Sequence, residues 1–92
     1  MRVNEYFDKV VVINLDRRKD RLEKVDAQLQ ELGITYERFS AIDAKALDID
    51  PIQACKQSHI QVLEESVGKT LILEDDAYFM EGFNERFTEF VE

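Results

Sequence analysis

Three short apolar runs, separated by segments with helical periodicity, constrain the fold of this chain more than any other feature. The first run covers residues 10–15 and is rich in β-branched side chains, so it predicts a buried strand. Residues 34–42 predict a second, less regular strand, and residues 69–73 predict a third. Strand, helix, strand, helix, strand is the order of a parallel sheet with right-handed crossover connections.

Helix signals lie between and after these runs. A stripe of apolar residues follows the first strand, and Gly33 is placed to end the helix that carries them: Leu22, Val25, Leu29 and Leu32. Asp50 and Pro51 predict the start of a second helix, with an N-cap followed by proline at the first helical position. We expect one face of this helix, which ends near Gly68, to carry Ile52, Cys55, His59, Val62 and Leu63.

The remaining segments are predicted with less detail. Residues 43–50 are polar and predict a loop with a short turn, whereas residues 82–91 predict a terminal helix. One side of the terminal helix should carry Phe83, Phe87 and Phe90, which together with Phe79 suit a core or a partner surface.

Together these elements predict an α/β fold with a single domain over residues 1–92. We expect a three-layer Rossmann-like unit with a short parallel sheet, strand order 2-1-3, and helices on both faces. In that order a topological switch separates the first and third strands, and ligands bind outside the carboxyl ends of strands at such a switch. Residues 14–18 and 74–76 should therefore meet in space.

Charge and composition restrict the partners and the compartment. The formal net charge of -8 argues against nucleic acid or an anionic membrane as the main partner. Cys55 is the single cysteine, so an internal disulfide is excluded and a reducing compartment is favoured. The N-terminal residues show no signal-peptide pattern, and no apolar run is long enough for a membrane span. We therefore expect a cytoplasmic protein.

An acidic triplet, Glu74, Asp75 and Asp76, directly follows the third predicted strand. In extended backbone Glu74 and Asp76 point to one side and Asp75 to the other. Two carboxylates on one side suit magnesium or manganese, completed by water and substrate phosphates. The alternative is an acid cluster at a helix N-terminus, which the helix macrodipole favours.

A basic cluster follows the first predicted strand and comprises Arg17, Arg18, Lys19, Arg21 and Lys24. Arginine side chains match phosphate oxygens in two contacts at once, and a helix N-terminus adds backbone donors. Asn14 and Asp16 lie in the same turn, and Asp16 suits an N-cap or a hydrogen-bond acceptor better than a catalytic acid. The alternative for the basic cluster is a solvated helix face paired with neighbouring acids.

Two further polar residues lie within the second predicted helix. We expect His59 to be a partly buried, hydrogen-bonded histidine and Cys55 to be a small buried hydrophobic residue. No second cysteine accompanies Cys55, so a nucleophilic role is not indicated.

Four segments, in order along the chain, resemble landmarks of glycosyltransferase family 25. This family contains lipopolysaccharide and lipooligosaccharide sugar transferases and the procollagen galactosyltransferases. The four segments are VINLDRRKDR at 12–21, YERFSAID at 36–43, ACKQSH at 54–59 and LILEDD at 71–76. The third segment departs from the family pattern, because Ala54 replaces a glycine and Lys56 and Gln57 replace a more apolar pair.

The resemblance implies a GT-A type fold, a nucleotide-diphosphate sugar donor, a glycan acceptor and a divalent metal, manganese or magnesium. Matched by position, the metal ligands would be Asp76, our first choice, and Glu74. The residues that would contact or support the nucleotide sugar are Asn14, Arg18, Arg21, Ser58, His59 and Asp75. No catalytic residue is assigned by this match.

Members of the family continue well past the acidic motif, so the chain matches only their N-terminal part and is expected to be truncated relative to them. We expect a glycosyltransferase-like domain that is inactive alone and works as a homo-oligomer or with a partner subunit. Two alternatives remain open at this point. One is a non-catalytic nucleotide- or metal-binding module, and the other is a protein-interaction domain that uses a sheet edge and the phenylalanine-rich helix.

Overall fold

A three-stranded parallel sheet in the order β2-β1-β3 forms the centre of the fold, which confirms the predicted topology. The structure is a computed structural model that describes residues 2–66 and 68–91, without the side chains of residues 90 and 91. The strands are β1 (Lys9–Asn14), β2 (Glu37–Ser40) and β3 (Thr70–Glu74). Each lies within a few residues of its predicted bounds, and β2 is the most shortened.

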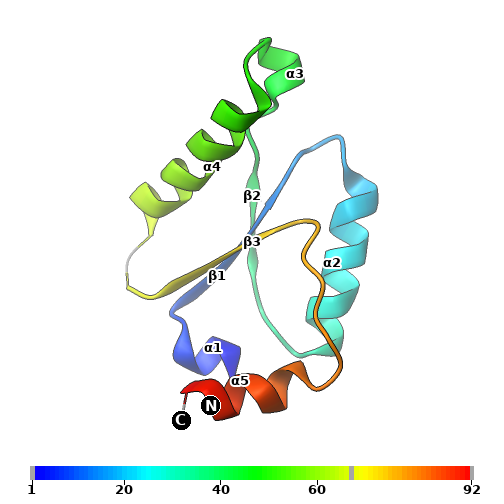
Figure 1. Ribbon diagram of the computed structural model, residues 1–92, viewed down its shortest axis with the longest axis vertical. Helices are drawn as coiled ribbons and strands as arrows, with labels where there is room; N and C mark the ends of the chain where they lie inside the picture. The colour runs from blue at the N-terminus through cyan, green and yellow to red at the C-terminus, as the bar shows by residue number, and fades with distance from the viewer. Residues whose placement is uncertain (1, 67, 92) are drawn as a thin grey trace.

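Five helices within the described residues connect and flank these strands. They are α1 (Val3–Tyr6), α2 (Lys19–Glu31), α3 (Ala44–Leu47), α4 (Pro51–Glu65) and α5 (Phe83–Val91). Figure 1 shows α2 and α4 on opposite sides of the strands, with α1 and α5 together at the end where both termini lie. None of these helices has both the length and the apolar composition needed to cross a membrane, within the described residues.

The central strand β1 is buried on both faces, which explains its continuous β-branched sequence. Val10 and Val12 face one side and pack in a cluster with Val25 and Leu29 of α2. Val11 and Ile13 face the other side and pack with Val62 of α4. The alternation of side chains along one strand therefore joins three layers, as predicted.

Two predicted helix boundaries are confirmed, the end of α2 at Gly33 and the start of α4 at Asp50 and Pro51. Gly33 has φ 70° and follows the end of α2, a conformation that glycine adopts without steric cost. Asp50 caps α4, because its Oδ1 accepts a hydrogen bond from the Ile52 backbone nitrogen at 3.0 Å. Pro51 occupies the first helical position.

The predicted face of α4 is wrong in part. The side chains buried against the sheet belong to Ala54, Ser58 and Val62, which lie four residues apart. Ile52 is 75% exposed and Leu63 is 60% exposed, and Cys55, predicted to be buried, is also exposed. Small residues on the inner face let the helix approach the segment after β2 closely, which large apolar residues would prevent.

Two short helices were not predicted. α3 lies within residues 43–50, and Asp43 caps it by accepting hydrogen bonds from the backbone nitrogens of Lys45 and Ala46. α1 buries Val3 in the same cluster as α2. Its Asn4 side chain exchanges two hydrogen bonds with the backbone of Thr35, which attaches α1 to the segment before β2.

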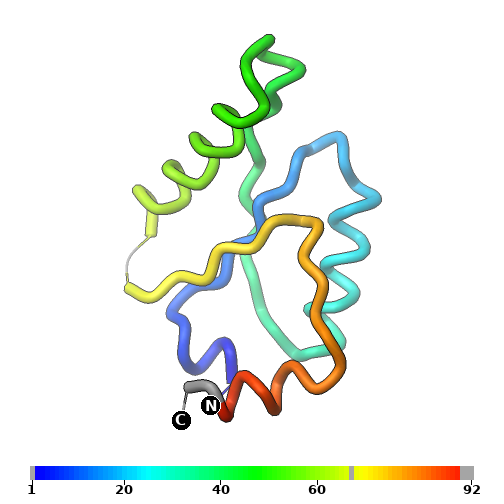
Figure 2. Tube along the Cα trace, viewed as in Figure 1, coloured from blue at the N-terminus to red at the C-terminus, as the bar shows by residue number. Residues whose placement is uncertain are grey.

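The aromatic residues of the C-terminal segment pack against the core. Phe79, Phe83 and Phe87 contact the cluster formed by β1 and α2, and Phe90 lies outside the described side chains. Phe87 also lies 5.9 Å from Tyr6 and 6.0 Å from Phe7, measured between ring centroids. Figure 2 shows the two ends of the chain side by side as a result. Of the two roles expected for these residues, a core or a partner surface, Phe83 and Phe87 therefore take the first in part, because they pack against the core cluster and Phe87 also packs against the aromatic residues at α1.

Candidate functional site

A cleft of about 300 Å³ opens where β1 and β3 end, between the turn after β1 and helix α4. This volume is at the lower end of the range for small-molecule sites. Its charged lining residues come from three parts of the chain, the turn and helix start after β1, the segment after β2 and the end of β3: Arg17, Arg21, Asp43, Lys45, Glu74, Asp75 and Asp76. The position confirms that residues 14–18 and 74–76 approach one another at the topological switch.

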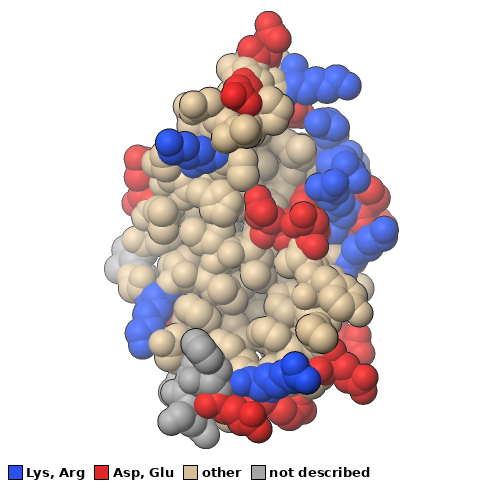
Figure 3. Space-filling view, in the orientation of Figure 1, with Lys and Arg blue, Asp and Glu red and all other residues tan. Residues whose placement is uncertain are grey.

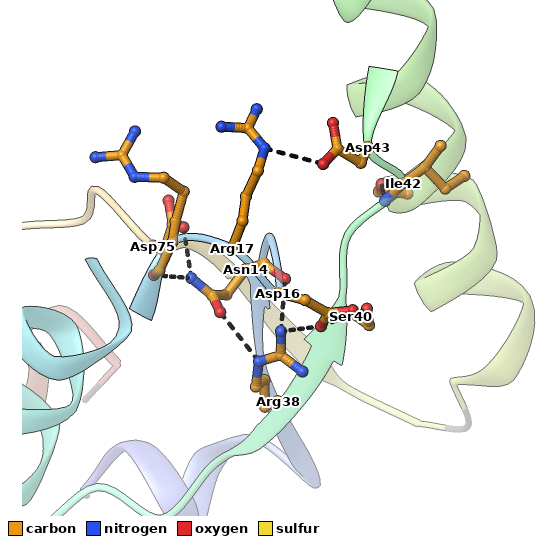
Figure 4. Close-up of polar contacts among 10 residues, drawn as sticks. Asn14, Asp16, Arg17, Arg38, Ser40, Ile42, Asp43 and Asp75 are labelled. Carbon is orange, nitrogen blue, oxygen red and sulfur yellow. Dashed lines mark hydrogen bonds and ion pairs between the residues drawn. The ribbon is translucent and has the colours of Figure 1, made fainter. Parts of the chain in front are cut away.

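Asn14, the last residue of β1, bonds to a residue of β2 and to the residue that follows β3. Its side chain is buried, with 2% of its surface exposed. The Nδ2 group donates to Asp75 Oδ2 at 2.8 Å and to the Arg18 carbonyl oxygen at 3.1 Å. The Oδ1 atom accepts from Arg38 Nε of β2 at 3.0 Å. Figure 4 shows Asn14 between Asp75 and Arg38. Asn14 therefore positions charged residues and has no free polar atom of its own.

Arg38 extends this network along the end of β2. Its guanidinium donates to the Asn14 carbonyl oxygen at 3.1 Å and also to Asp16, which accepts a further bond from the Ser40 hydroxyl at 2.8 Å. The bond from Arg38 is the main cause that lowers the pKa of Asp16 below its ordinary value. Asp16 is thus a hydrogen-bond acceptor, one of the two roles predicted for it.

The three arginines after β1 point in different directions. Arg17 and Arg21 line the cleft, where Arg17 Nε donates to Asp43 at 2.9 Å and Arg21 lies 3.6 Å from Asp75. Arg18 lies outside the cleft lining and donates two hydrogen bonds of 3.0 Å to Asp20. These bonds lower the pKa of the Asp20 carboxyl to about 2. The basic cluster is thus divided between the cleft and the start of α2.

The acidic triplet is divided in a similar way. Asp75 has only 10% of its side chain exposed and faces Asn14 and Arg21. Glu74 faces α4, where its Oε1 accepts a hydrogen bond from Cys55 Sγ at 3.3 Å and lies 3.7 Å from His59 Nε2. Asp76 is exposed at the cleft. Figure 3 shows acidic side chains beside basic ones in the middle of this face. Carboxylate oxygens of this kind suit magnesium or manganese.

Ser58 and His59 differ although they are adjacent. Ser58 is 1% exposed, and its hydroxyl donates to the Ala54 carbonyl oxygen at 3.0 Å while accepting from the Ile42 nitrogen at 2.9 Å. It therefore fixes the segment after β2 against α4, at the wall of the cleft. His59 is partly exposed and faces Glu74, outside the cleft lining. One turn earlier on α4, the Cys55 thiol donates a hydrogen bond to the Glu74 carboxylate, and this bond is the main cause that raises the pKa of the thiol.

Sequence reasoning missed two residues of this region, Arg38 and Asp43, and named Arg17 only as one member of the basic cluster. Arg38 carried a signal, because a charged residue within a short strand next to a buried strand needs a partner at the sheet edge. Arg17 and Asp43 are distant in sequence, and only the return of the chain after β2 brings them together.

Comparison with known proteins gives a consistent assignment. Residues 7–60 match the sequence model of a family described as glycosyltransferase family 25, LPS biosynthesis protein. A procollagen galactosyltransferase 2 of Mus musculus is 28% identical over 94% of this chain. A putative glycosyltransferase of Acanthamoeba polyphaga mimivirus is 34% identical over 87% of it. The matches include β1, the turn after it, β2 and most of α4.

These relatives are much longer than the matched region. The chain spans 18% of the length of the mouse protein and 32% of the viral protein. No solved structure matches the chain at a comparable level of significance. The comparisons therefore identify the family of this α/β unit, and the activity of a complete protein has to be argued from the cleft.

Proposed function

This chain belongs to glycosyltransferase family 25, and on that basis we propose that its cleft binds the diphosphate of a nucleotide-diphosphate sugar. The observation that carries this proposal is the meeting of Arg17, Arg21 and the acidic triplet in one cleft at the topological switch. Arginines suit phosphate oxygens, and carboxylates suit the divalent ion that accompanies a diphosphate. We include the GT-A type of fold in the proposal.

The arginines of the cleft are available to a ligand. The pairs Arg17–Asp43 and Arg21–Asp75 include arginine side chains that are 52% and 44% exposed. The Arg17–Asp43 pair is the more exposed of the two, and exposed ion pairs contribute little to stability, so exchanging Asp43 for a phosphate group costs little. Asp75 is largely buried, but it keeps its hydrogen bond from Asn14 when Arg21 contacts a ligand. Asn14 and Ser58 would support the site by holding Asp75 and the segment after β2, and His59 would support Glu74.

We propose that Glu74 and Asp76 hold manganese or magnesium. Such an ion, when bound, stabilises negative charge on the leaving diphosphate. Arg21 and Arg17 would bind the same phosphates from the other side of the cleft, and this is electrostatic stabilisation rather than covalent catalysis. Asn14 keeps Asp75 beside Arg21, so the carboxylate limits how far that arginine moves.

The acceptor is proposed only as a class. The matched relatives include a procollagen galactosyltransferase, and the family description refers to lipopolysaccharide biosynthesis. We propose transfer of a sugar to a hydroxyl group of a glycan or a protein. Because this chain spans a small part of its relatives, we assign the transfer to the complete protein and expect this chain alone to bind without turnover.

The first test concerns metal-dependent binding. Nucleoside diphosphates titrated into the chain should bind more tightly with manganese than without it, because the ion links the phosphates to Glu74 and Asp76. Manganese with nucleotide should also raise the melting temperature, since both ligands bind only the folded state. Asp76→Asn should remove the effect of manganese, whereas the matched variant Asp48→Asn, in the exposed turn after α3, should retain it.

An equal manganese effect in Asp76→Asn would remove Asp76 from the metal site. Two other results would separate the alternative functions. Binding without turnover, also in a longer relative, would favour a non-catalytic module. No binding of any nucleotide, nucleotide sugar or metal would favour an interaction domain.

The second test separates the arginines. Arg21→Ala should weaken binding of a nucleoside diphosphate about 10–150-fold, the equivalent of about 1.5–3 kcal/mol for a lost charge-assisted contact. Arg18→Ala removes the same charge from a neighbouring position that is paired with Asp20, and we expect a smaller loss. Calorimetric titration at fixed ionic strength measures both.

Equal losses in the two arginine variants would mean that Arg18 turns into the cleft when ligand binds. No loss in either variant would show that the basic cluster is only the solvated start of α2.

A further inference from the structure

A second group of side chains that suits a metal ion lies on the α4 side of the acidic triplet. Cys55 and His59 are four residues apart, so they occupy one face of α4 in successive turns. Glu74 reaches this face from the end of β3. One ligand atom from each of the three residues lies within 4.8 Å of the other two.

The separations are close to those of a tetrahedral metal site. Zinc bonds of about 2.3 Å to sulfur and about 2.0–2.2 Å to nitrogen and oxygen place ligand atoms about 3.4–3.6 Å apart at tetrahedral angles. In the structure, Cys55 Sγ is 3.3 Å from Glu74 Oε1, and His59 Nε2 is 3.7 Å from the same oxygen. The third separation, between Cys55 Sγ and His59 Nε2, is at most 4.8 Å, so small side-chain movements would admit an ion.

The kinds of donor atom indicate which ion would bind. Thiolate and imidazole ligands favour zinc and other late first-row metals, whereas magnesium and manganese prefer oxygen ligands. A thiolate and a carboxylate together balance the charge of one divalent cation, and a neutral imidazole adds none. Cys55 is exposed and both His59 and Glu74 are at least partly exposed, so the ion can enter from solvent.

From this geometry we infer that Cys55, His59 and Glu74 form a site for one thiophilic divalent ion, with Zn²⁺ as its preferred occupant. Binding forms bonds from the metal to Sγ, to Nε2 and to a carboxylate oxygen, and the thiol proton passes to solvent. The fourth position would hold water. The site uses the thiol and the imidazole, which the proposed manganese site does not use.

Glu74 belongs to both groups of ligands, and this has a consequence that rests on the proposed function. An ion held by Cys55 and His59 would keep Glu74 at α4, where it already lies, so its carboxylate would not be available to a manganese ion beside Asp76. Zinc should then weaken manganese-dependent binding of a nucleoside diphosphate. The zinc site itself does not depend on whether a nucleotide binds.

Cobalt(II) is the direct probe, because a thiolate ligand gives it a charge-transfer absorption in the near ultraviolet. The sequence has one cysteine and one histidine, so this band can arise only from Cys55. Titration of the reduced chain should develop the band with one cobalt per chain, and zinc should abolish it by displacement. Cys55→Ser should lack the band, and His59→Ala should bind zinc about 10–100-fold more weakly or worse.

A matched control keeps one thiol but moves it. In the double variant Cys55→Ser/Lys56→Cys, the thiol is shifted by one residue, about 100° around the helix, away from Glu74. This variant should show neither the band nor tight zinc binding. Asp76→Asn should retain both, which separates this site from the proposed manganese site. In the wild-type chain, zinc should also slow alkylation of Cys55, and manganese should not.

Three results would overturn the inference. One is unchanged zinc affinity in Cys55→Ser, and another is a cobalt band that persists in the double variant. The third is one metal per two chains with Cys55 bridging them, which sedimentation in zinc would reveal. Failure of nucleotide binding would leave all these measurements intact, so the two proposals are tested separately.

Discussion

Replacing Asn14 by alanine should lower the free energy of unfolding by about 2–4 kcal/mol, a large part of the stability expected for a domain of this size. The amide is buried and makes hydrogen bonds to Asp75, Arg38 and the Arg18 backbone. Its loss would leave a partly buried carboxylate and a guanidinium without their shared partner. Urea unfolding followed by circular dichroism measures the change.

Two further variants show whether the loss of stability comes from the buried position of Asn14 or from the loss of any hydrogen-bonded amide. Asn14→Asp keeps the shape and the acceptor for Arg38 but places a carboxylate against Asp75, so it should cost at least as much as alanine. Asn4→Ala removes an exposed amide that bonds to the Thr35 backbone and should cost only about 0.5–1.5 kcal/mol. Similar losses in Asn14→Ala and Asn4→Ala would refute a special role for Asn14.

Phe87→Ala should lower the free energy of unfolding by about 2–3 kcal/mol. The ring is partly buried between the core cluster and α1, and it lies 6.0 Å from Phe83 and 5.9 Å from Tyr6 between centroids. Truncating a large aromatic residue removes its packing and leaves a void. Tyr78→Ala, at a side chain that is 81% exposed, is the matched control and should change stability little.

The expectation that the chain self-associates or needs a partner remains a prediction, and the same variant tests whether Phe87 takes part in that association. Sedimentation velocity should give the same association state for Phe87→Ala and wild type, because Phe87 packs within its own chain. A dimer that dissociates in Phe87→Ala, with unchanged unfolding of the monomer, would instead make the phenylalanine-rich helix the interface.

The sheet was predictable from sequence because each strand is a short apolar run and each crossover has a clear start or end. Asp50, Pro51 and Gly33 mark helix boundaries through local chemistry, so their prediction does not depend on tertiary contacts. With right-handed crossovers and one helix on each face of the sheet, the strand order is 2-1-3, which places the two charged segments together.

The inner face of α4 could not be predicted in the same way. Hydrophobic periodicity selected Ile52, Cys55 and Leu63, but close approach to the segment after β2 selects Ala54 and Ser58. The hydrogen bond between the Ile42 nitrogen and the Ser58 hydroxyl is a tertiary contact, and the hydrophobic periodicity of the sequence does not indicate it. The partners of Arg17 and Arg38, which are Asp43 and Asn14, could not be predicted from the sequence either. Both contacts depend on how β2 is aligned with β1.

β3 occupies one edge of the described sheet, and the acidic triplet lies at its carboxyl end. A further strand laid parallel to β3, whether from the same polypeptide or another molecule, would end beside Glu74 on the side remote from the arginines. The loop that leaves such a strand would approach the cleft from the side opposite Arg17 and Arg21. Widening the sheet in this direction would therefore add lining residues to the cleft without displacing the arginines that we propose bind the diphosphate.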